Sequence, residues 1–141
     1  MAEVADVRRR FRQRIQEARR QAEARRVEGD RAARDYEMFL RDTATPAFFM
    51  VASVLTAEGY PFKVYTPANS LRLSSTNSRD DYLELELDTE PSPPVVMGRV
   101  NRNRGGRLVT IERPIRPGAA VAELTQDDVV DFVLSEFDRF V

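Results

Sequence analysis

The stretch Thr45–Gly59, with the sequence TPAFFMVASVLTAEG, decides how the rest of the chain is interpreted. Its middle is apolar apart from Ser53. Thr45 is suited to cap the start of a helix, Pro46 to occupy the first turn, and Gly59 to end it in a left-handed conformation. We therefore predict a buried helix here. At about a dozen residues it falls short of the roughly 20 that are needed to cross a bilayer.

The composition describes one globular unit and excludes several kinds of chemistry. Of 141 residues, 42% are hydrophobic and 32% are charged, and the net charge is -1. A chain of this length buries about two-thirds of its unfolded surface, enough for a single core. The absence of cysteine and histidine excludes disulfides, thiolate metal sites, cysteine nucleophiles and imidazole acid–base steps. No apolar segment follows the arginines at 8–10, so we expect no secretory signal, no membrane span and a cytoplasmic location.

Charge is divided unevenly between two parts of the chain. Residues 1–42 hold twelve arginines and nine acidic residues, a net of +3, whereas residues 43–141 hold ten basic and fourteen acidic residues, a net of -4. We interpret 1–42 as a long charged helical arm that serves oligomerisation, and 43–141 as a single compact α+β domain. Only Lys63 among the 22 basic residues is lysine, a bias that we attribute to a GC-rich bacterial genome and not to function.

Residues 3–41 predict one long helix, because they contain no proline and consist mainly of good helix formers. Apolar residues recur there every three or four positions and form a narrow stripe: Val4, Val7, Phe11, Ile15, Ala18 and Ala22. At 1.5 Å per residue the helix would be roughly 55 Å long, which is more than one small domain can cover. We therefore predict that the stripe is a self-association surface and favour a homodimer.

Beyond Gly59 the apolar period changes from 3.6 to 2, which indicates strands. We expect a break at Asp42–Ala44 before the buried helix, and then five strands near residues 60–66, 71–76, 82–88, 95–102 and 107–114. The third strand, YLELELD, alternates leucines with acidic residues, so its acidic side chains are expected in water. The connections are short, which favours antiparallel neighbours.

The C-terminal segment 125–141 predicts a helix that begins at a cap formed by Thr125 and Asp128. Its apolar residues cover a wide arc, so we expect it to touch the sheet and a second surface, either a helix or another subunit. The predicted fold class is α+β, in the order α-α-β-β-β-β-β-α. An antiparallel five-stranded meander is packed on one face by the central and C-terminal helices, and a long N-terminal helical arm precedes them.

Two groups of arginines are candidate anion-binding residues. The first lies between residues 8 and 26, a segment that contains nine arginines and only two acidic residues, both glutamates. This segment could follow phosphates, rest on an anionic membrane, or form a solvated face beside a coiled-coil seam. The second surrounds the turn at 101–106, where guanidinium groups could hold a phosphate or carboxylate, or pair with acidic residues across the sheet. The candidates are Arg8, Arg12, Arg19, Arg26, Arg102, Arg104 and Arg107.

Three carboxylates stand at alternate positions of the predicted third strand: Glu84, Glu86 and Asp88. They could bind a metal ion or act as the catalytic pair of a glycosidase. Catalysis by two carboxylates requires one of them to be desolvated, whereas strict alternation places all three in water. We therefore expect no catalytic residue, no cofactor and no metal.

These observations favour a non-enzymatic protein-binding or assembly module that self-associates through its helices, with a different protein partner as a further possibility. The alternative is an anion or nucleic-acid binder that uses the arginine-rich helix, and nucleic acid is the less favoured partner. A small-ligand-binding domain, or an enzyme without histidine or cysteine chemistry, comes third.

Overall fold

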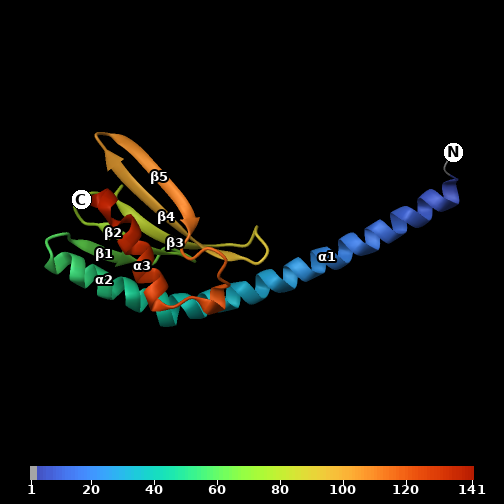
Figure 1. The fold of residues 1–141 in the computed structure, drawn as a ribbon, viewed down its shortest axis with the longest axis horizontal. Coiled ribbons are helices and arrows are strands. Elements are labelled where there is room, and N and C mark those ends of the chain that lie inside the picture. Colours follow the sequence, from blue (N-terminus) through green and yellow to red (C-terminus); the bar gives the residue numbers. More distant parts are fainter. Residues whose placement is uncertain (1–2) are drawn as a thin grey trace.

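The computed structural model describes residues 3–141, which form a long helix followed by a five-stranded sheet and a C-terminal helix (Figure 1). The sheet and the helices that cover it make up a body, and the long helix extends from this body as a protruding arm. The α+β fold class and the order of elements are as predicted from the sequence.

Helix α1, Val4–Phe39, and helix α2, Thr45–Ala57, belong to one continuous helical rod. A π-helical turn, Leu40–Ala44, joins them, so the predicted break at Asp42–Ala44 is wrong. Thr45 has helical backbone angles (φ -62°, ψ -48°) and donates its N–H to the carbonyl of Leu40, so it does not cap α2. Pro46 has no N–H to donate, and the wider π turn before it keeps the chain helical without that bond.

Gly59 ends the rod as predicted. Its φ of +93° lies in the left-handed region, and the N–H of Tyr60 bonds to the carbonyl of Leu55 at 2.8 Å. This closure occupies Tyr60, so the first strand starts two residues later than predicted.

The strands form an antiparallel meander in the order β1-β2-β3-β4-β5, so every strand pairs with its neighbours in sequence. They are β1 (Phe62–Tyr65), β2 (Leu71–Ser75), β3 (Tyr82–Asp88), β4 (Val95–Arg104) and β5 (Arg107–Pro114). Strands β1 and β5 are the two edges. No helix or strand among residues 3–141 packs over the remaining face of the sheet, opposite the helices.

The core lies between one face of the sheet and the two helices α2 and α3. Six buried side chains of β2, β3 and β4 form its floor: Leu71, Leu73, Leu83, Leu85, Val96 and Val100. From α2, Phe48 and Ala52 pack onto this floor, and Val51 and Leu55 lie at its margin. The buried helix predicted for this stretch is therefore present, with one face on the core.

Helix α3, Gln126–Glu136, covers the other half of the same face through Val129 and Phe132. Thr125 caps it as predicted, because its hydroxyl accepts the N–H of Asp128 and the Asp128 carboxylate accepts the N–H of Thr125. The helix is shorter than predicted, and a 3-10 turn, Phe137–Phe140, completes the C-terminal segment.

The base of α1 is anchored where it passes the sheet. Ala32, Tyr36 and Phe39 are buried, and the Tyr36 hydroxyl donates to the carbonyl of Leu85 at 3.1 Å. Burial raises the pKa of Tyr36, and the negative charges of the two glutamates of β3 raise it further. Farther up the helix, the hydroxyl of Ser92 donates to the carboxylate of Glu28 at 3.0 Å, so the contacts that hold the arm lie in its C-terminal third.

Candidate functional site

The apolar stripe of the arm is uncovered. Val4 is 75% exposed, Phe11 64% and Ile15 47%, and none of the stripe residues is buried by the body. The arm extends away from the sheet over this length (Figure 1). Val7 is half-buried by its own helix, and the small residues Ala18 and Ala22 continue the stripe toward the body. The predicted self-association residues thus share one free helix face.

Arginines flank this stripe on both sides. Some are ion-paired within the helix, as Arg26 is with Glu23 and Asp30. Among residues 3–141, five arginines of this segment form no ion pair: Arg8, Arg12, Arg14, Arg19 and Arg25. Spacings of four and seven residues place the candidates at 8, 12, 19 and 26 along one side of the stripe.

A wholly apolar groove runs between α2 and α3 on the outside of the helical layer and has a volume of about 200 Å³. One wall comes from α2, through Met50, Val51, Val54 and Leu55. The other comes from α3 and the turn that follows, through Val130, Val133, Leu134 and Phe137. Met50 and Phe49 of α2 are both at least half exposed. Periodicity does not show how far two adjacent helices separate, so the groove itself was not predicted.

The charged residues that the two helices of the groove carry themselves are all acidic, and neighbouring arginines pair with some of them. Helix α2 has no charged residue, and α3 has four acidic residues and no basic one. Arg116 pairs with Asp128, and Arg113 and Arg139 pair with Glu136 at 2.8 and 2.7 Å.

Those contacts hold one of the α3 carboxylates in its charged form. Burial alone would raise the pKa of Glu136, but hydrogen bonds from Arg113 and Arg139, together with their charges, hold the pKa below its ordinary value. The exposed carboxylates Asp127 and Asp131 make no ion pair within residues 3–141. Asp127 and Asp131 precede the groove residues Val130 and Leu134 by three positions of the same helix, so they lie on the groove side of α3 next to its apolar wall.

The same surface belongs to a segment with membrane-like composition. By length and composition alone, the continuous helix Val4–Ala57 holds an 18-residue stretch apolar enough to cross a membrane, and 28% of that stretch is buried in the molecule. Core helices also pass this test, and Ala47 and Phe48 of α2 are fully buried.

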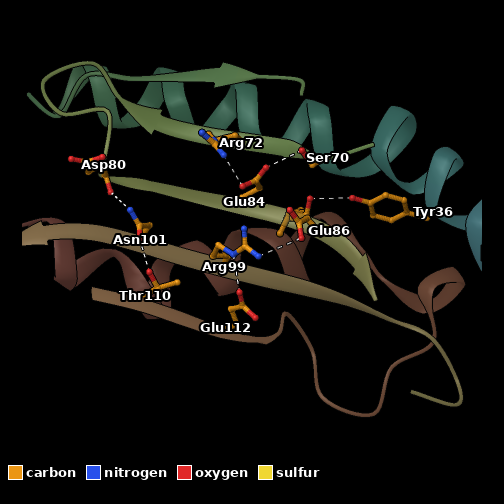
Figure 2. A network of polar contacts seen from close by, with 11 residues as sticks. Tyr36, Ser70, Arg72, Asp80, Glu84, Glu86, Arg99, Asn101, Thr110 and Glu112 are labelled. Carbon is orange, nitrogen blue, oxygen red and sulfur yellow. Dashed lines mark hydrogen bonds and ion pairs between the residues drawn. The ribbon is translucent and has the colours of Figure 1, made fainter. Parts of the chain in front are cut away.

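The uncovered face of the sheet carries a network of polar side chains (Figure 2). Glu84 is only 3% exposed, so the expectation that alternation leaves it in water is wrong. Its carboxylate accepts hydrogen bonds from Ser70 and Arg72, both at 2.9 Å, and Arg72 stacks over the ring of Tyr82. Long neighbouring side chains on the adjacent strands therefore bury a carboxylate that the strand pattern places outside.

The glutamates of this network are paired with arginines. Arg99 lies between Glu86 and Glu112, with nitrogen-to-oxygen distances of 3.7 and 2.8 Å. Within residues 3–141, no group of three or more carboxylates lies close enough to hold a metal ion. Among the buried side-chain nitrogen and oxygen atoms of residues 3–141, only the Nε of Arg72 has no hydrogen-bond partner.

The second set of candidate arginines lies at the β4–β5 hairpin tip. Arg104 and Arg107 face each other across the turn, and no ion pair joins either of them, or Arg102, to the acidic residues of β3. The N–H of Gly106 is bonded to the side chain of Asn103 at 2.9 Å. The tip is thus basic, but one of its backbone donors is already occupied.

Comparison of the chain with protein-family models, with curated proteins and with solved structures gives no match.

Proposed function

We propose that this protein is a non-enzymatic assembly module that self-associates through its helices, as a homodimer. The observation that carries the proposal is the free stripe on the arm, where Phe11 is 64% exposed at a site that the body does not reach. Burying a large apolar side chain is worth about 1.5–3 kcal/mol, so a helix face with several such residues gains substantially from a partner.

The size of the arm supports a protein partner over a small ligand. A helix of 36 residues is about 54 Å long at 1.5 Å per residue, and only its C-terminal third touches the body. Helix-in-groove and helix-on-helix contacts use apolar residues at spacings of three, four and seven, which is the spacing of the stripe. The acidic body and the basic arm would also attract one another between two copies.

The test compares two full-length variants that carry the same change in charge. Phe11→Glu with Ile15→Glu places two acids in the stripe, whereas Gln13→Glu with Gln16→Glu places two acids on other faces of the same turns. We expect sedimentation velocity to show the first variant as a monomer at concentrations where the second is a dimer. Equal behaviour of the two variants would contradict the proposal.

A second candidate function is anion or nucleic-acid binding by the arm, and the unpaired arginines favour it. Replacing Arg8, Arg12 and Arg19 by glutamine should weaken binding to a nucleic-acid duplex and lower the salt dependence by about one unit of log–log slope per arginine. The matched control replaces Arg9, Arg20 and Arg26, which are paired with acids inside the helix. Binding that does not change with salt, or no binding, would exclude this function.

A further inference from the structure

The groove between α2 and α3 and the stripe on the arm are two apolar surfaces that lack a partner within one chain. The margins of the groove are open, since Val54 is 56% exposed and Leu134 65%. An apolar slot of this kind lowers its free energy by binding another apolar surface.

The dimensions of the groove fit a helix. Its α2 wall runs from Met50 to Leu55 and its α3 wall from Val130 to Phe137, so the two walls cover about one and a half and about two helical turns. On the arm, Val7, Phe11 and Ile15 follow one another at four-residue spacing and also cover about two turns. Helices that bind in grooves insert side chains at such spacings.

The charges beside the groove and beside the arm's stripe are opposite in sign. On α3, Asp127 and Asp131 lie three residues before the groove residues Val130 and Leu134 and form no ion pair within residues 3–141, while unpaired arginines lie on both sides of the arm's stripe. Opposite charges at the rim of an apolar contact select the partner and its orientation.

We propose that the groove between α2 and α3 is the receptor for the N-terminal arm of a second copy of this chain, with Phe11 and Ile15 seated in it. A chain cannot fill its own groove in this way, because α1 and α2 form one continuous rod and the arm points away from the groove (Figure 1). This inference rests on the proposed self-association and adds the surface that receives the arm.

Site-specific crosslinking tests this contact without background, because the chain has no cysteine. Full-length chains carrying Ile15→Cys are mixed with full-length chains carrying Leu134→Cys and treated with a short bismaleimide. Each chain then has a single thiol, so every product is intermolecular. Both positions are exposed, which makes the substitutions compatible with the fold. We expect the mixed crosslink in high yield and a loss of most of it when Gln13→Cys replaces Ile15→Cys.

The outcomes separate this inference from the proposed function. If the chain is a dimer but Ile15→Cys crosslinks only to itself, the arms pair with each other, and the receptor inference fails while self-association stands. If the chain is a monomer, both fail. If vesicles of phosphatidylserine and phosphatidylcholine bind the chain through Leu134 and no mixed crosslink forms, the groove contacts lipid and the inference is overturned.

Charge reversal independently tests the proposed pairing between the α3 carboxylates beside the groove and the arginines beside the arm's stripe. Asp127→Arg with Asp131→Arg should weaken dimerisation about tenfold, as should Arg12→Glu with Arg19→Glu, since two rim pairs are worth on the order of 1.4 kcal/mol together. An equimolar mixture of the two variants should recover the lost affinity, because each groove then meets an arm of opposite charge. A mixture as weak as either variant alone would contradict the proposed contact.

Discussion

Gly98, on β4, lies directly under the ring of Phe132 from α3. A Cβ at this position would stand 2.2 Å from the ring Cζ, and the ring is 1% exposed, so it has little room to move. This glycine therefore sets how closely α3 approaches the sheet.

Gly98→Ala should lower the free energy of unfolding by about 1–3 kcal/mol, because it overpacks a fixed contact. Gly29→Ala is the matched control, since nothing lies within 4 Å of the added carbon there and alanine favours a helix. Urea unfolding of both variants measures the effect. A Gly98→Ala protein as stable as the control would mean that α3 is free to shift on the sheet.

The ion pairs of Glu136 should make the free energy of unfolding depend on pH. Its pKa in the unfolded chain is near the ordinary value of 4.5 and lies lower in the fold, so the pair with Arg113 and Arg139 stabilises the protein above that pH. Below pH 4.5 the unfolded chain takes up a proton here before the folded chain does, so this stabilisation shrinks, and it is lost as pH falls through the lower pKa of the folded state.

Glu136→Gln should therefore cost about 1–2 kcal/mol at neutral pH, with the difference from the parent shrinking in acid. Asp138→Asn, at an exposed acid nearby, should change little at any pH. Unfolding free energies measured between neutral pH and acid test this. A difference that grows in acid would have the wrong sign.

At the scale of elements, α2 supplies the centre of the core. Phe48 is fully buried against the sheet, whereas its neighbour Phe49 is mostly exposed. Phe48→Ala should thus cost about 3–5 kcal/mol, and Phe49→Ala much less, although both remove the same atoms. Equal losses in a thermal or urea unfolding experiment would show that the helix is rotated from the position described.

Most of the elements could be predicted because their signals are local. Alternating leucines identify β3, and the Thr125–Asp128 cap identifies the start of α3. Thr45 and Pro46 gave an equally local signal for the start of a new helix, and that prediction is wrong. A π turn before the proline keeps the backbone helical, so α1 continues into α2. The burial of Glu84 was not predicted for a different reason: it depends on Arg72, which lies on a neighbouring strand.

At the scale of the whole molecule, the chain separates a basic helical arm from an acidic body. Residues 1–42 have a net charge of +3 and residues 43–141 a net charge of -4. The stripe on the arm could be read from the sequence, because its period is that of a helix. The groove could not, because it exists only once α2 and α3 lie side by side on the sheet. Sequence therefore identifies one of the two apolar surfaces, and only the fold shows the other.

The mass of the intact chain in solution tests the central claim most directly. Sedimentation equilibrium at tens of micromolar should give twice the chain mass of 16.1 kDa. It should return toward the single-chain mass on dilution, or when Phe11 and Ile15 are both replaced by glutamate. A mass of 16.1 kDa at every concentration would contradict self-association and leave the exposed stripe without the partner proposed for it.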